Sequence, residues 1–158
     1  MVAPWQETPD KVVVEFKRSG RGVHRVIELS HHPNVLPPQL AARGVSPQLW
    51  AALMADVNAL AASHPYAAKP SGGQVAKWAG CFCLLSVIGF GVVQPDAGDW
   101  NLWLGQAEQV VARHQAAFSQ QGVALSVARA QGSYWIQADC CAPVVAAVPG
   151  VPVPVKAV

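Results

Sequence analysis

Segments with the residue pattern of β-strands occur in pairs at the two ends of this 158-residue chain. Lys11–Phe16 is a run rich in β-branched residues, and a glycine-containing turn separates it from the alternating segment Val23–Leu29. Near the other end, Val123–Ala130 and Ser133–Asp139 alternate in the same way on either side of a short turn. We expect two antiparallel hairpins that join into one four-stranded sheet.

The region between the hairpins begins with a clear helical pattern. Ser46 is expected to cap the helix, Pro47 suits its first position, and the helix should run to about Ser63. Apolar residues recur at spacings of three and four, which predicts one buried face. These residues are Leu49, Trp50, Leu53, Met54, Val57, Leu60 and Ala61.

Two further helices are expected. Gln74–Val93 is apolar all round, which predicts a central helix covered on several sides. Asp99 is expected to cap the last helix, from Trp100 to about Gln121, and Gly122 is a suitable stop after it. The apolar face of that helix comprises Trp100, Trp103, Leu104, Ala107, Val110, Val111, His114 and Phe118.

The resulting order, ββαααββ, predicts an α+β fold in which a four-stranded antiparallel sheet packs on three helices. Residues 1–10 form an N-terminal extension, 11–139 the domain, and 140–158 an extended tail. A composition with 52% hydrophobic and 13% charged residues predicts a folded core rather than a disordered chain.

The tail, Ala142–Val158, contains seven valines, four alanines and four prolines among its 17 residues. The prolines exclude a helix or a central strand. It is either a low-complexity end or an apolar extended arm for the groove of a partner.

The net charge of +2 disfavours a nucleic-acid-binding protein, because such proteins carry a basic surface. Only Lys17, Arg18, Arg21 and Arg25 are locally dense. The N-terminus has neither a basic start nor an apolar stretch typical of a secretory signal, so a cytoplasmic location is expected.

The four cysteines form two tight pairs, Cys81 with Cys83 and Cys140 with Cys141. Neither pair has the spacing of a structural zinc site, so no metal is expected. On a helix Cys81 and Cys83 lie about 200° apart, so they cannot share an ion or a disulfide. Both are either small buried side chains or sites of S-acylation on a membrane-facing helix.

The inventory of catalytic residues is thin. His31 and His32 precede a proline in a polar loop, and His114 is expected to be a satisfied boundary residue on an apolar helix face. No nucleophile motif, phosphate-binding loop or zinc-protease motif occurs. We therefore expect no enzyme activity and no cofactor.

Six tryptophans exceed the usual need of one core in a chain of this size. Five of them, including Trp135, lie on expected helices or strands, either as core or as interface anchors. The candidate partner-binding residues are Trp50, Trp78, Trp100, Trp103, Val144, Val151 and Val153.

Short motifs along residues 11–139 carry a family resemblance. They are Lys11-Val12-Val13-Val14, Leu36–Arg43, Trp50 with Asn58-x-Leu60, Gly80-Cys81-x-Cys83-Leu84, Gly122-Val123-x-Leu125 and Gly132-x-Tyr134-Trp135-Ile136. In order and spacing the chain resembles the golgin subfamily A member 7 family, the Erf-type accessory subunits of DHHC palmitoyltransferases.

The resemblance implies a non-catalytic subunit that stabilises a membrane-embedded DHHC acyltransferase. It implies peripheral attachment to Golgi or other endomembranes, with Cys81 as the lipid site and Cys83 as a second candidate. The alternative is a structural subunit of a large cytoplasmic, cytoskeletal or ciliary assembly, held by its apolar tail and tryptophan-rich surface. Homo-oligomer formation is not an obvious expectation.

Overall fold

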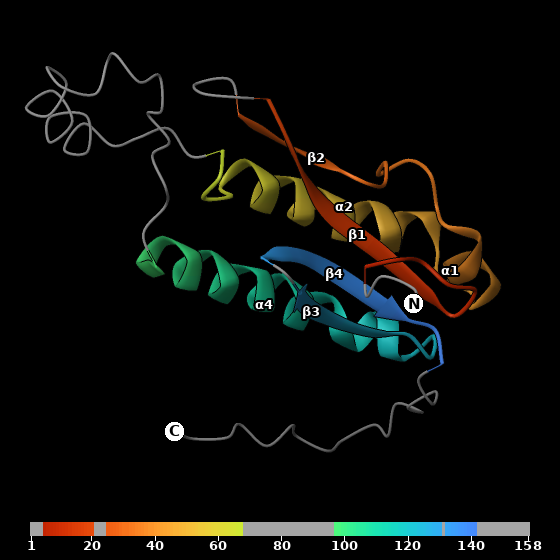
Figure 1. The fold of residues 1–158 in the computed structure, drawn as a ribbon. Helices are drawn as coiled ribbons and strands as arrows, with labels where there is room; N and C mark the ends of the chain where they lie inside the picture. The colour runs from red at the N-terminus through yellow and green to blue at the C-terminus, as the bar shows by residue number, and fades with distance from the viewer. Residues whose placement is uncertain (1–4, 21–24, 68–96, 131, 142–158) are drawn as a thin grey trace, which may run out of the picture.

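The computed structural model describes residues 5–20, 25–67, 97–130 and 132–141 (Figure 1). It contains a four-stranded antiparallel sheet in the order β2-β1-β4-β3. The strands are β1 (Lys11–Ser19), β2 (Val26–Leu29), β3 (Ala124–Ala130) and β4 (Ser133–Asp139). The predicted α+β fold and the joining of the two hairpins are confirmed.

The two central strands come from opposite ends of the sequence. β1 pairs with β4 in a register that places Val14 beside Ile136, and each of the two is flanked by its own hairpin partner. β1 continues three residues beyond the expected end at Phe16, while β2 begins at Val26 rather than at Val23. Long-range pairing of the chain ends therefore closes the sheet.

The helix α2 (Pro47–Ala62) agrees with its sequence pattern. The Ser46 hydroxyl accepts a hydrogen bond from the Leu49 amide at 3.1 Å, as an N-cap should. The expected apolar face is buried except for Leu49, which is only partly covered. Apolar periodicity was sufficient here because one face of α2 packs against the sheet.

Two helices differ from expectation. The short helix α1 (Pro38–Ala42) was not among the expected helices; it begins at a proline, which is well tolerated in a first helical turn. The helix α4 (Ala97–Ser119) begins three residues before Trp100, so Asp99 lies in its first turn rather than at its cap. The expected helix over residues 74–93 lies outside the described residues.

The end of α4 does follow the prediction. Gly122 has a φ of 68°, the left-handed conformation in which glycine is free of a Cβ clash. The Val123 amide bonds back to the Phe118 carbonyl at 3.1 Å, which closes the last turn before β3.

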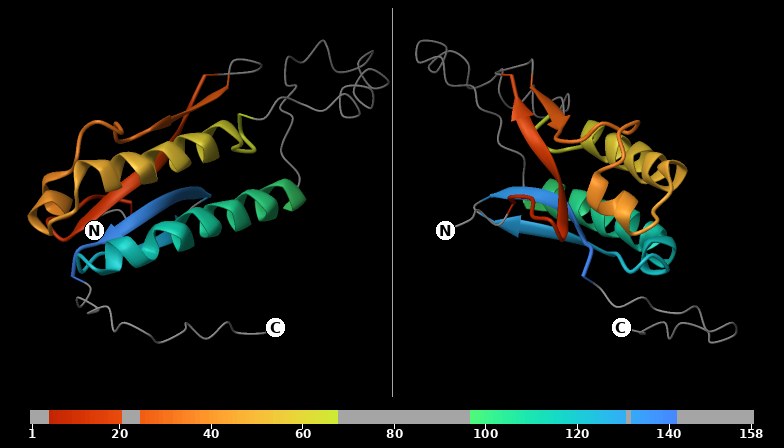
Figure 2. Two further views of the ribbon diagram at one scale, coloured as in Figure 1. Left: turned by 180° about the vertical axis from the view of Figure 1, so that it is seen from behind. Right: turned by 90° about the vertical axis from the view of Figure 1, so that its right-hand side faces the viewer.

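The helices cover one face of the sheet, and the core lies between the two layers (Figure 2). Alternate residues of β1 point into this core. The fully buried large side chains include Trp50, Leu53 and Met54 from α2, Trp103 and Phe118 from α4, and Val12 and Ile136 from the sheet.

Trp50 and Trp103 were candidate partner-binding residues, and the structure corrects this prediction. They are only 1% and 2% exposed, so neither ring is available to a partner in this fold. Trp100 is half-buried and stays a candidate.

The opposite face of the sheet is partly covered by residues of the N-terminal extension. Trp135 and Val13 point to this face, and yet they are 2% and 1% exposed. Trp5 packs edge-on against Trp135 at a centroid distance of 6.2 Å, and Thr8 bridges to Lys11. This part of the extension therefore belongs to the folded unit.

Candidate functional site

An aromatic cluster fills one end of the core, where α2 ends and α4 begins. It is formed by Phe16, His64, Trp100, Trp103 and Tyr134. The closest pair is His64 with Trp103, at 4.6 Å between ring centroids, and Trp100 stacks on Tyr134 at 5.2 Å. The Trp103 indole donates a hydrogen bond of 2.9 Å to the Leu60 carbonyl. The cluster therefore connects both long helices to the sheet.

His64 is the one buried polar residue of this cluster, with 1% of its surface exposed. Its Nδ1 accepts a hydrogen bond from the Tyr66 amide at 3.1 Å, so the neutral ring carries its proton on Nε2. Burial, and secondarily the charge of Arg18, lower the pKa of His64 to about 4. The imidazole is therefore neutral near pH 7.

Two arginines lie against Tyr66, and one of them also contacts the cluster. The guanidinium carbons of Arg18 and Arg25 lie 5.4 and 5.0 Å from the Tyr66 ring centroid, within the range of cation–π contacts. Arg18 also lies 5.7 Å from the Trp100 ring and donates to the Gly132 carbonyl at 2.7 Å. These contacts place a cationic rim around aromatic rings.

The rim lies beside the end of α2 and the start of α4, because Tyr66 follows α2 and Trp100 lies near the start of α4. Ala67 follows the end of α2 at Ala62, and α4 begins at Ala97. His64 and Trp100 flank these helix ends, and their ring centroids are only 5.1 Å apart. The end of α2 and the start of α4 therefore lie at the same end of the fold (Figure 1).

Several candidate residues cannot be placed. Trp78, Cys81 and Cys83 lie within segment 68–96, outside the described residues. The same holds for Val144, Val151 and Val153 of the tail. Their proposed roles stay predictions.

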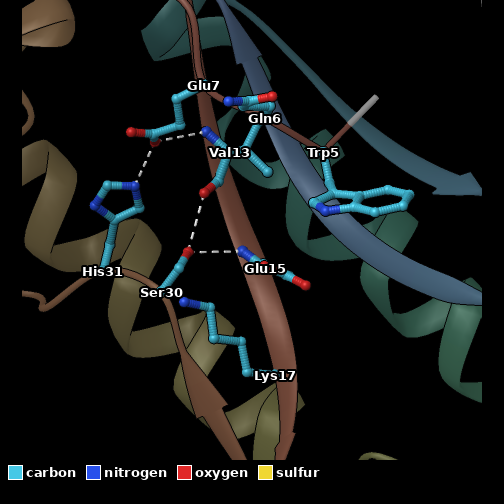
Figure 3. Close-up of a pocket in the computed structure, with 8 residues that line it drawn as sticks. All are labelled: Trp5, Gln6, Glu7, Val13, Glu15, Lys17, Ser30 and His31. Atoms are coloured by element: carbon cyan, nitrogen blue, oxygen red, sulfur yellow. Dashed lines mark hydrogen bonds and ion pairs between the residues drawn. The ribbon is translucent and has the colours of Figure 1, made fainter. Parts of the chain in front are cut away.

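A second feature is an open hollow of about 370 Å³ beside β1. It is lined by Trp5, Gln6, Glu7, Val13, Glu15, Lys17, Ser30 and His31. Figure 3 shows Trp5 to one side of β1, over β4, and Ser30 and His31 to the other. The hollow lies where β2 has ended and the edge of β1 has no strand beside it.

Side chains form hydrogen bonds with the backbone groups at this edge of β1. A Glu7 carboxylate oxygen accepts from the Val13 amide at 3.0 Å, and the Ser30 hydroxyl accepts from the Glu15 amide at 2.9 Å. The same hydroxyl donates to the Val13 carbonyl at 3.0 Å. The polar groups of the hollow therefore complete the sheet, and they block the addition of another strand at this point.

Ser30, His31 and Glu7 are residue types that can form a nucleophile, a base and an orienting acid. His31 Nε2 lies 2.6 Å from the Glu7 carboxylate, and its ring packs edge-on against Trp50. The Ser30 hydroxyl, however, bonds to β1 rather than to His31. The arrangement therefore lacks the hydrogen bond between nucleophile and base that such catalysis needs.

A third polar group joins the two long helices. Asp56 Oδ2 on α2 accepts hydrogen bonds from Arg113 at 2.7 Å and from His114 Nε2 at 2.9 Å on α4. The bond from His114, together with the charge of Arg113, outweighs the opposing effect of burial and lowers the pKa of Asp56. His114 thus has a hydrogen-bond partner at the boundary between α2 and α4, as expected from the sequence.

Replacing Asp56 with asparagine will make the stability less sensitive to acid. Because the pKa of Asp56 in the folded protein is below its ordinary value of 3.8, the stabilisation is fully present above pH 3.8 and is lost as the pH falls through the folded pKa. At pH 7 the free energy of unfolding of the variant should be about 1 kcal/mol lower than that of wild type, which is the upper end of the range measured for partly exposed ion pairs. Urea unfolding at pH values from 2 to 7 measures both effects.

Glu108→Gln is the matched control for this variant. It removes the same charge from an exposed position on α4, where the structure places no partner among the described residues. Its stability should stay within about 0.5 kcal/mol of wild type. If the two variants have the same pH profile, the contact between Asp56 and His114 does not stabilise the fold.

The second cysteine pair lies at the opposite end of the molecule, after β4. Cys140 is buried, and burial raises the pKa of its thiol, which disfavours the reactive thiolate. Cys141 is exposed. Within the part of the chain that the structure describes, no group of three or more His, Cys, Asp or Glu residues could hold a metal ion.

Sequence reasoning did not identify the aromatic cluster with its arginine rim. The advance signals were the local density of basic residues around the first hairpin and the apolar helix face that includes Trp100 and Trp103. Nothing in the sequence indicated that Tyr66 and Trp100 would lie against the basic residues.

Comparison with known proteins adds no relative. No protein-family model, no curated protein and no solved structure matches the chain. None of the described helices is both long enough and apolar enough to cross a bilayer.

Proposed function

We propose that this protein is a non-catalytic accessory subunit that binds and stabilises a membrane-embedded protein S-acyltransferase of the DHHC class. One observation carries the proposal: both attachment points of segment 68–96 lie at one end of the fold, beside the aromatic cluster. That segment contains the uncharged run Trp78–Val93 with Cys81 and Cys83. The two residues that flank this cysteine-bearing apolar segment, Ala67 and Ala97, thus lie at the same end of the folded α+β unit.

The residue resemblance to Erf-type subunits agrees with this geometry. Among the motifs that carry it, Val12 and Val14 of β1, Leu40 of α1, Trp50 of α2 and Ile136 of β4 all lie in the core. The shared residues are thus those that build the fold. The function itself rests on the apolar segment, whose cysteine Cys81 is the proposed acylation site.

Co-expression of the full chain with a DHHC acyltransferase, followed by purification in detergent, tests the proposal. We expect the chain to co-purify and to increase the yield of folded acyltransferase. Hydroxylamine-sensitive acyl labelling of the chain should be lost in Cys81→Ser. The matched control is Cys141→Ser, which removes an exposed cysteine at the other end of the molecule and should keep the label.

Absence of co-purification would overturn the proposal, as would labelling that Cys81→Ser leaves unchanged. Recovery of the chain in a large protein assembly, with release on deletion of Ala142–Val158, would instead favour the structural-subunit alternative.

A further inference from the structure

The described charges are unevenly distributed over the fold. At the end of the fold that holds the aromatic cluster, the described charged residues are the cations Lys17, Arg18, Arg25 and Arg129 and the anions Glu28 and Asp99. The other described charges are the anions Glu7, Asp10, Glu15, Asp56, Glu108 and Asp139 and the cations Lys11, Arg43 and Arg113. One end is therefore net positive, while the remainder is net negative.

Exposed apolar side chains accompany these cations. Three large hydrophobic residues in the described part of the chain are exposed, and two of them, Val26 and Leu102, belong to this end. Val26 pairs with Ser19 at the tip of the β1–β2 hairpin and is 47% exposed. Leu102 follows Trp100 near the start of α4 and is 68% exposed.

We propose that this surface, here called the basic end and formed by Lys17, Arg18, Arg25, Val26, Leu102 and Arg129, docks on an anionic lipid membrane. Basic side chains near such a surface gain from its negative potential, while apolar side chains enter the headgroup boundary. Tyr66 and Trp100, half-buried beside the arginines, are residue types enriched at that boundary.

The position of the basic end also favours a membrane over another occupant. Ala67 and Ala97, the described residues on either side of segment 68–96 with its apolar run, lie at this end. A single acyl chain anchors a protein only marginally, and a basic patch is one of the second signals that make anchoring stable. The inference deepens the proposed function, because the basic end would orient the protein beside a membrane-embedded enzyme.

Binding of the purified, unacylated full chain to vesicles tests this inference. The probes are vesicles of phosphatidylcholine alone and vesicles in which about a third of the lipid is phosphatidylserine, a fraction chosen to give a strongly negative surface. We expect binding to the anionic vesicles only, weakening as salt is raised. Lys17→Gln and Arg129→Gln, both at exposed positions, should each lower the partition coefficient about fivefold.

Two controls separate the basic end from general charge and hydrophobicity. Arg43→Gln removes the same charge at an exposed position on the opposite end and should leave binding unchanged. Leu102→Ser should lower binding about tenfold, the effect of withdrawing one leucine from an apolar phase. Val35→Ser alters a residue that is equally apolar and 62% exposed but lies outside the basic end, and it should have no effect.

Equal binding to both kinds of vesicle, or wild-type binding by Lys17→Gln and Arg129→Gln, would overturn the inference. The inference would also be overturned if the basic-end variants bound vesicles normally but no longer co-purified with the acyltransferase in detergent, because the basic end would then contact the enzyme rather than lipid. The proposed function fails separately, if the chain binds anionic vesicles but never co-purifies with an acyltransferase.

Discussion

Replacing Trp103 with alanine will lower the free energy of unfolding by about 3–5 kcal/mol, the usual cost of removing a buried tryptophan. The ring is 2% exposed and lies 5.1 Å from Phe16 and 4.6 Å from His64, centroid to centroid. The substitution leaves a cavity between α2, α4 and the sheet, and it removes the hydrogen bond to the Leu60 carbonyl. Urea unfolding followed by circular dichroism measures the loss.

Leu102→Ala provides a matched control for Trp103→Ala. Leu102 is the preceding residue of α4 and is 68% exposed, so its truncation should change stability by less than about 0.5 kcal/mol. A loss below about 1 kcal/mol for Trp103→Ala would mean that this ring does not hold the two layers together. Because Leu102 belongs to the basic end, its variants also separate membrane binding from stability.

The second large effect is a loss of stability between pH 6.5 and pH 4, caused by His64. Its pKa is about 4 in the folded protein and 6.5 in a model peptide, so the unfolded chain binds the proton more readily across that interval. The stabilisation is therefore fully present above pH 6.5 and falls as the pH decreases toward 4. Its full extent is about 3 kcal/mol.

His64→Asn isolates this effect from other titrating groups. The asparagine oxygen can take the place of Nδ1 and accept from the Tyr66 amide, but the side chain does not ionise. The variant should be less stable at pH 7, because it leaves space among the rings. Its unfolding free energy should change less than that of wild type from pH 7 to pH 4, and parallel profiles would show that His64 is not held neutral by the fold.

Local patterns were sufficient to predict most elements of the fold. The periodicity around Trp50 and Trp103 identified the inward faces of α2 and α4, and alternation identified β4 from Ser133 to Asp139. Capping chemistry located the start of α2 at Pro47. In each case the geometry of one element determines which side chains share a face.

The patterns were less informative about which tryptophans would be exposed. Trp50 and Trp103 were expected to contact a partner. Both lie on the apolar faces that define their helices, and these faces pack into the core. Trp135 points to the other face of the sheet and is still buried beside Trp5. Composition alone could not separate core tryptophans from interface tryptophans, because both are large and apolar.

The candidate sites depend on residues far apart in the sequence. Arg18 meets Trp100 only because β1 pairs with β4 and α4 packs across them. Asp56 meets His114 only because α2 and α4 lie side by side.

By itself the sequence determined the four strands, the two long helices α2 and α4 and the faces that these elements bury, since such faces follow from side-chain direction within each helix or strand. Only the tertiary structure decided that His64 is buried and neutral, and that basic and apolar side chains gather at one end. Both properties arise from packing between elements, which determines solvent access and the distance between charges.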